Sequence, residues 1–180
     1  VTISDSSFCG VVEQSITVHV VEPPVASISA STDTICSGGQ VTFFQGSSGP
    51  NQSYQWNFGN NNNWQNLGSG NVNFTFNTAG TFVVSNRVFN NGWGSACADT
   101  ATVVVTVLPS PTASITASPA QACDSLTTAL NVVSNSGVLF NWNLGSFGTF
   151  TGQTPDTLTI TTPGNYNISV LVTSANGCTK

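Results

Sequence analysis

The chain has 180 residues, of which 5% are charged, against about a quarter in an average soluble domain, and 39% are hydrophobic. Its formal net charge is −5, and its two basic residues are Arg87 and Lys180. We therefore expect no nucleic-acid partner and no binding to anionic membranes, because the chain has almost nothing with which to neutralise phosphates. No apolar run reaches the roughly 20 residues that cross a bilayer, so no membrane insertion is expected.

Every element that the sequence predicts is a β-strand. The first 22 residues include the run SITVHV (15–20), in which apolar and polar residues alternate as in a strand with one buried face. Runs dense in β-branched and aromatic residues, separated by Gly, Pro and Asn, predict strands near 25–31, 40–45, 53–58, 72–76, 81–89 and 100–107. No segment keeps a helical apolar period, so little or no helix is expected. Short strands at this spacing predict an all-β fold of sandwich type.

An internal repeat organises these strands. PVASISASTDTICSGG (24–39) matches PTASITASPAQACDSL (111–126) at an offset of 87 residues. Near the end of the repeat, GSACADTATVVVTVLPSP (94–111) matches SSFCGVVEQSITVHVVEPP (6–24). The Trp-Asn-x-Gly corner also occurs twice, at Trp56 and at Trp142.

The repeat predicts three parts in the chain. Residues 1–22 are expected to form the last strands of a preceding repeat, residues 23–108 a complete sandwich, and residues 109–180 a second sandwich that lacks its last strand. We expect the chain to be a window of a longer array. The proline-containing linkers at 21–25 and 108–112 should set neighbouring sandwiches in a semi-rigid row.

Five cysteines and no methionine are typical of an exported protein, in which disulfides form. Four predicted strands separate Cys36 from Cys97, and an even number of antiparallel traverses returns the chain to the pole that it left. The same count applies to Cys123 and Cys178. The sequence therefore predicts the pairs Cys36–Cys97 and Cys123–Cys178, with Cys9 left for a preceding repeat.

A metal-binding or catalytic thiol is the alternative interpretation of these cysteines. It needs clustered ligands or an imidazole beside a thiol, and the only histidine is His19. Structural disulfides are the favoured interpretation.

Three segments carry a family resemblance: SYQWNFGN (53–60), NFTFNTAGTFVVSNRVFN (73–90) and TATVVVTV (100–107). They resemble the pattern of polycystic-kidney-disease (PKD) domains. With ICSGG (35–39) and NGC (176–178), the chain is also similar to the tandem PKD-like and immunoglobulin-like repeats of large secreted surface proteins of Bacteroidetes bacteria. The resemblance implies tandem immunoglobulin-like sandwiches, secretion, and roles as adhesin stalks, filaments or spacers beside enzymes.

One departure from the PKD pattern bears on metal binding. The family has two aspartates at the Trp-Asp-Phe-Gly-Asp corner, where this chain has Asn57 and Asn60, and Asn143 and Ser146 in the second repeat. A calcium ion prefers carboxylate oxygens. We therefore expect no metal and no cofactor at this corner.

The acidic residues do not form a catalytic set in the sequence. Glu13 and Glu22 lie at or beside the first predicted strand, and the aspartates are scattered. No paired acids, Ser-His-Asp set or phosphate-binding Gly-rich loop is recognisable, so we expect no enzyme activity.

Four of the five aspartates instead precede Ser or Thr and then an apolar residue. This pattern is similar to the O-glycosylation signal of exported Bacteroidetes proteins, and it predicts glycans on Thr34, Thr100, Ser125 and Thr157. Glycans would cover sheet edges on a surface with few charges. The alternative is that these aspartates cap turns before strands.

Several aromatic residues are candidates for contacts with a partner. Trp64, Trp93 and Phe150 lie in Gly- and Asn-rich stretches, and exposed tryptophans serve carbohydrate and protein binding. Simple packing over the end of the sandwich is the favoured alternative. Trp56 and Trp142 are expected in the cores, from their place in the repeat.

Together these features predict a structural segment of a long, repetitive, secreted cell-surface protein that forms a fibre, stalk or adhesin. Its expected partners are neighbouring repeats or copies of itself. The alternative is a carbohydrate- or protein-binding accessory or spacer module of a secreted enzyme, with glycans as partners.

Overall fold

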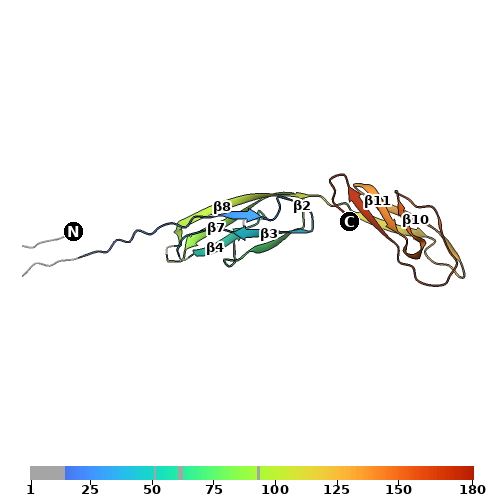
Figure 1. Ribbon diagram of the computed structural model, residues 1–180, viewed down its shortest axis with the longest axis horizontal. Coiled ribbons are helices and arrows are strands. Elements are labelled where there is room, and N and C mark those ends of the chain that lie inside the picture. The colour runs from blue at the N-terminus through green and yellow to red at the C-terminus, as the bar shows by residue number, and fades with distance from the viewer. Residues whose placement is uncertain (1–14, 51, 61–62, 93) are drawn as a thin grey trace, which may run out of the picture.

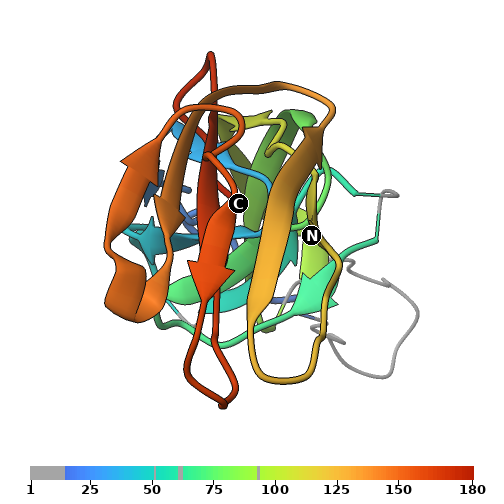
Figure 2. The same ribbon diagram turned by 90° about the vertical axis from the view of Figure 1, so that its right-hand side faces the viewer.

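A computed structural model describes residues 15–180 except 51, 61–62 and 93. Cys9 and Trp93 therefore lie outside the described residues. Two β-sandwiches follow one another in a row, preceded by an extended segment (Figure 1). Figure 2 looks along this row with the second sandwich in front.

The first sandwich packs a three-stranded sheet against a five-stranded sheet. The smaller sheet has the order β1-β3-β6, and the larger has the order β2-β8-β7-β4-β5. The strands are β1 (Ile28–Ala30), β2 (Thr34–Cys36), β3 (Gly39–Gln45), β4 (Gln52–Asn57), β5 (Gln65–Asn66), β6 (Val72–Phe76), β7 (Gly80–Asn90) and β8 (Gly94–Leu108). All pairs are antiparallel except β2 and β8, which run parallel with Cys36 opposite Leu108.

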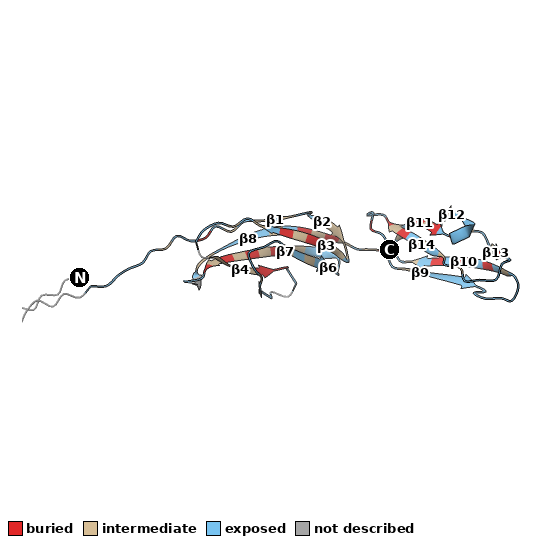
Figure 3. Ribbon diagram, turned by 60° about the horizontal axis from the view of Figure 1, so that its bottom comes forward, coloured by how far each residue is buried: buried red, intermediate tan, exposed pale blue. Residues whose placement is uncertain are grey.

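Buried residues alternate with less buried ones along these strands (Figure 3), and the buried ones form the first core. Val41 and Phe43 of β3 face Val105 and Val107 of β8, and all four belong to one buried cluster. Trp56 of β4 lies fully buried in the same cluster. Burial along these strands alternates with a period of two even where the sequence does not, since Val105 is buried and its neighbour Val104 is exposed.

The second sandwich has two three-stranded sheets, with the orders β13-β10-β9 and β12-β11-β14. The strands are β9 (Ala113–Ser118), β10 (Leu126–Ser134), β11 (Gly137–Asn143), β12 (Thr149–Thr151), β13 (Leu158–Ile160) and β14 (Ser169–Ser174). A short 3₁₀ helix, η1 (Gly145–Phe147), follows β11. The core contains Leu130, Val132, Phe140, Trp142, Leu144 and Val172.

The all-β sandwich prediction is confirmed, and the six strands expected between residues 25 and 107 are all present. The sequence reasoning missed β2 and β5. β5 is a polar Gln-Asn pair with no apolar alternation, and it is held by pairing with Gln55 and Trp56 of β4. β2 has three residues and is held by its parallel pairing with β8. Both strands exist because of a neighbour, which local sequence does not encode.

Candidate functional site

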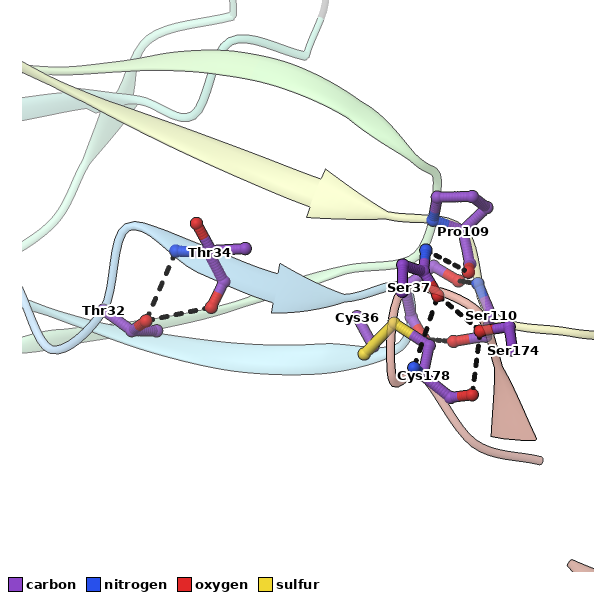
Figure 4. Close-up of a disulfide and its surroundings, with 9 residues drawn as sticks. Thr32, Thr34, Cys36, Ser37, Pro109, Ser110, Ser174 and Cys178 are labelled. Carbon is purple, nitrogen blue, oxygen red and sulfur yellow. Dashed lines mark hydrogen bonds between the residues drawn. A yellow bond between two sulfur atoms is a disulfide. The ribbon is translucent and has the colours of Figure 1, made fainter. Parts of the chain in front are cut away.

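A disulfide between Cys36 and Cys178 joins the two sandwiches (Figure 4). The Sγ atoms are 2.03 Å apart and the Cα atoms 5.6 Å apart, although 142 positions separate the two cysteines in sequence. Cys36 ends β2 of the first sandwich, and Cys178 follows β14 of the second. The chain therefore connects the sandwiches twice, once through the peptide linker and once through sulfur.

Local structure places each cysteine at the junction. β2 runs parallel to β8, so Cys36 lies beside Leu108, the residue at which β8 passes into the linker. On the other side, the turn after β14 includes Gly177 with a φ of 83°, a conformation that favours glycine. The backbone N–H of Ser174 donates to the carbonyl of Cys178 at 2.9 Å, which closes this turn and directs Cys178 toward the first sandwich.

Hydrogen bonds surround the bridge and hold the linker. The N–H of Ser110 donates to Oγ of Ser37 at 3.1 Å, and Oγ of Ser110 donates to the carbonyl of Ser37 at 3.1 Å. From the second sandwich, Nδ2 of Asn176 donates to the carbonyl of Pro109 at 3.2 Å. Sequence reasoning did not predict these contacts of Ser37, Ser110 and Asn176, although Ser37 and Asn176 lie in the ICSGG and NGC segments that carry the family resemblance.

The structure corrects the predicted pairs Cys36–Cys97 and Cys123–Cys178. The count of four traverses between Cys36 and Cys97 omitted β5, which runs antiparallel to β4 and adds one traverse. An odd number of traverses leaves the two cysteines at opposite poles. Along β8 itself, eleven positions separate Cys97 from Leu108, the neighbour of Cys36. At about 3.3 Å per residue, that distance is far beyond the reach of a disulfide.

Cys97 and Cys123 are free thiols in the structure. Cys97 is half-buried, near the start of β8, and Cys123 is exposed in the loop before β10. Cys97 and Cys178 hold equivalent places. NTAGTFVVS (77–85) matches TTPGNYNIS (161–169), so Phe89 corresponds to Thr173. Ala98 lies opposite Phe89 in the first sandwich, and Thr179 bridges Thr173 in the second, each directly after its cysteine.

The two Trp-Asn corners have the structure that the repeat predicts. Trp56 and Trp142 are both buried core residues, which confirms their expected role. Oδ1 of Asn57 accepts the N–H of Gly59 at 2.8 Å, and Oδ1 of Asn143 accepts the N–H of Gly145 at 2.9 Å. Each asparagine thus closes a tight turn on its own backbone.

The four residues predicted to carry glycans are all exposed: Thr34, Thr100, Ser125 and Thr157. Capping by the adjacent aspartate is also seen at one of them. The carboxylate of Asp99 accepts the N–H groups of Ala26 and of Thr100, each at 2.8 Å. These two hydrogen bonds, the one from Ala26 first, lower the pKa of Asp99 below its ordinary value of 3.8.

The predicted contact aromatics have different environments. Trp64 is 38% exposed, in the loop before β5. Phe150 of β12 instead packs against the second core, which agrees with the favoured interpretation of packing and not with a partner contact. β12 pairs with β11 and sets Phe150 opposite Trp142, a contact that its Gly-rich surroundings did not indicate.

In the described part of the chain, no three His, Cys, Asp or Glu side chains are grouped so as to hold a metal ion. No described helix is long and apolar enough to cross a membrane.

These features define a pair of immunoglobulin-like β-sandwiches with a covalently bonded junction. Residues 26–106 match the family model described as "PKD domain". This match confirms the PKD resemblance for the first sandwich. PKD and immunoglobulin-like domains are generally non-catalytic.

Solved structures with a similar fold include the PKD domain of the human VPS10 domain-containing receptor SorCS2, at 20% identity and a TM-score of 0.40, covering 59% of this chain and 95% of that chain. The ectodomain of mouse nectin-like molecule 4 is 20% identical with a TM-score of 0.39, over 86% of this chain and 61% of that one. A carbohydrate-binding module of the β-sandwich superfamily is 11% identical with a TM-score of 0.44, over 87% and 86%. The comparison with curated proteins found no match.

Proposed function

We propose that this chain is a structural segment of a long, repetitive, secreted surface protein that forms a fibre, stalk or adhesin. The observation that supports this proposal most directly is the Cys36–Cys178 bond between consecutive sandwiches. Such a bond restricts motion between consecutive sandwiches, as an extended element that bears load requires.

The two covalent connections between the sandwiches, the linker and the disulfide, should stiffen the chain. A linker alone lets two domains bend and twist about it, and interfaces between domains of one chain are commonly mobile. A second covalent connection restricts both motions. The hydrogen bonds of Ser110 with Ser37 and of Asn176 with Pro109 also restrict bending and twisting at the junction. Force applied along the row would pass through two connections in parallel.

An extracellular location fits the same features. Disulfides persist in oxidising compartments and are rare in the cytosol. We also propose glycans on Thr34, Thr100, Ser125 and Thr157, whose exposure leaves them accessible to a transferase. Intact-mass measurement of the natively produced protein tests this modification. Hexose-sized increments that disappear after alanine substitution at these positions are expected, and the bare polypeptide mass contradicts it.

Small-angle X-ray scattering tests the mechanical role. We expect Cys178→Ser to broaden the distribution of interdomain distances, because only the linker then joins the sandwiches. Cys97→Ser is the matched control, since it removes a free thiol and leaves the bridge. Identical scattering of Cys178→Ser and Cys97→Ser would contradict a stiffening role for the junction.

Carbohydrate binding is the second candidate, and the 38% exposure of Trp64 favours it. A glycan array probed with the chain would then give signals that Trp64→Ala removes. Phe147→Ala is the matched control, because Phe147 is 40% exposed in the second sandwich. Equal signals from the two variants, or none from the unmodified chain, would contradict a binding role for Trp64.

A further inference from the structure

A groove of 380 Å³ lies at the edge of β4 in the first sandwich, and we call it the β4 groove. Ligand sites in proteins commonly measure about 300–1,000 Å³, so the β4 groove is large enough for a small ligand. Its walls come from β4, from β7, and from β5 with the residues after it. They include Gln52, Ser53, Tyr54, Asn66, Ser69 and Phe89.

The second sandwich closes the corresponding place with its own backbone. β12 there corresponds to β5, because each of these strands pairs with the tryptophan of its own sandwich. Gly152 lies directly after β12, and its N–H donates to the carbonyl of Phe140 at 2.9 Å. The carbonyl of Gly152 accepts the Nε1–H of Trp142 at 3.1 Å. The chain after β12 therefore continues along the edge of β11.

Leu67 holds the place of Gly152 in the first sandwich, directly after β5. A φ of 146° favours glycine at that place, and a Cβ atom on Gly152 would lie 2.8 Å from the Phe150 ring. Leu67 instead packs against the first core. Among the described residues no hydrogen bond joins Leu67 to β4, and Nε1 of Trp56 is buried without a partner. The segment 67–69 thus departs from the edge of β4, and both line the β4 groove.

The lining of the β4 groove is polar and aromatic. Two side-chain amides, two serine hydroxyls and the half-buried rings of Tyr54 and Phe89 belong to it. No described Asp, Glu, Lys, Arg or His lines it. A charged ligand would lose hydration there without gaining a counter-charge, which is costly. The lining therefore favours a neutral ligand that offers apolar faces to the rings and hydroxyl groups to the amides.

Asn66 contributes a hydrogen-bond donor that is already oriented. Its Oδ1 accepts the Nε2–H of Gln55 at 3.0 Å, which fixes the amide plane. Its Nδ2 has no partner among the described residues, and the side chain is exposed. An amide held in this way loses little conformational freedom when it binds an oxygen of a ligand.

We propose that the β4 groove binds a neutral saccharide. Tyr54 and Phe89 provide apolar surface for a sugar ring, and Nδ2 of Asn66 donates to one of its hydroxyl groups. This inference rests on the carbohydrate-binding candidate above, and it adds the site and the uncharged class of ligand. The junction between the sandwiches plays no part in it.

A neighbouring hollow provides the comparison that a test needs. It has a volume of 420 Å³, shares Leu67 and Gly68 with the β4 groove, and is otherwise lined by residues 70–73. No aromatic residue lines this hollow, so it offers no platform for a sugar ring. Asn71 lines it as Asn66 lines the β4 groove, and both asparagines are exposed. Asn66→Ala and Asn71→Ala are therefore a matched pair.

An NMR titration of the isotope-labelled chain tests the site. The probes are neutral disaccharides of glucose, galactose and mannose, with disaccharides that contain glucuronic acid as the charged comparison. We expect the neutral probes to shift the signals of the residues that line the β4 groove. Asn66→Ala should weaken binding about tenfold and Asn71→Ala by less than about twofold, because only the first removes a hydrogen bond to the sugar. Equal effects of the two substitutions overturn the proposal.

A second pair of variants tests the aromatic surface. Phe89→Ala should also weaken binding about tenfold, because it removes apolar contact area beneath the sugar ring. Phe44→Ala is the matched control, since Phe44 is 41% exposed on β3, in the other sheet of the same sandwich. Thermal unfolding of each variant verifies that the sandwich is folded. Unchanged binding by folded Phe89→Ala overturns the assigned site.

The remaining outcomes separate the site from the function on which it rests. Binding that is lost in Trp64→Ala and retained in Asn66→Ala and Phe89→Ala overturns the β4 groove, but leaves carbohydrate binding in place. Failure of every neutral disaccharide to bind overturns both. Tighter binding of the glucuronic acid disaccharides than of the neutral ones overturns the uncharged class of ligand.

Discussion

The two sandwiches share a repeat but are closed in different ways. In the first, the 15-residue strand β8 lies between β2 and β7 and contributes Val105 and Val107 to the core. In the second, β14 pairs with β11 on one side, and the described residues beside its other edge are Thr179 and Lys180. A groove of 640 Å³ lined by Thr128, Ile160 and Tyr166 lies in the described part of the second sandwich.

The two cores also differ in their content of aromatic residues, which is higher in the first sandwich. The first core contains a connected group of rings: Phe43, Trp56, Phe58, Phe74, Phe76 and Phe82. The second has Trp142 and Phe140 among aliphatic residues, with Phe150 at its edge. The tryptophan corner is therefore the element that the two sandwiches share, while the stability of each sandwich depends on what surrounds that corner.

The largest expected change in stability comes from truncating the two core tryptophans, and it should differ between them. Trp56→Ala should destabilise the first sandwich by about 4 kcal/mol, because a fully packed core cannot collapse around the cavity. Trp142→Ala should cost less in the second sandwich, where the adjacent groove permits relaxation. Chemical unfolding followed by fluorescence measures both changes, and a larger loss for Trp142→Ala would contradict the ranking of the two cores.

The next effect concerns the bond between the sandwiches. Cys178→Ser should lower the free energy of unfolding by about 3 kcal/mol, because the bridge closes a long loop and restricts the unfolded chain. Cys123→Ser, at an exposed free thiol, should leave stability unchanged in the monomer. Urea titrations under non-reducing conditions provide the measurement, and equal stability of the two variants would contradict a stabilising role for the junction.

A smaller effect is expected at the corresponding core positions Thr128 and Val41. Thr128→Val should stabilise the second sandwich by about 1 kcal/mol, because it removes a buried hydroxyl that has no partner at nearly constant volume. Val41→Thr should destabilise the first sandwich, where β8 covers the site. If Thr128→Val is destabilising in thermal unfolding, its hydroxyl has a partner and the groove is differently filled.

The smallest effect is electrostatic and belongs to the first sandwich. Backbone N–H groups of Ala26 and Thr100 lower the pKa of Asp99 in the folded state. A lowered folded-state pKa contributes stability above the unfolded pKa, near 3.8, and this contribution is lost as the pH falls through the folded value. The stability difference between the unmodified chain and Asp99→Asn should therefore be present at neutral pH and disappear in acid. A difference that does not change with pH would contradict this origin.

Local sequence patterns were sufficient to predict the all-β class, the main strands and the buried tryptophans. Trp56 and Trp142 were recognisable because a repeated corner and a period of two are local patterns, and burial follows them directly. The asparagine turns at Asn57 and Asn143 were accessible for the same reason, since each is closed within three residues.

Local patterns could not predict which cysteines meet, where β5 pairs or how Phe150 is packed. The partner of Cys36 depends on the parity of strand traverses, and one polar pair, Gln65–Asn66, changes that parity without an apolar signal. Phe150 is packed because β12 pairs with β11, and Thr128 has no partner because no described strand covers it. These outcomes depend on contacts between segments distant in sequence, and the local periodicity that predicts a strand does not specify its neighbour.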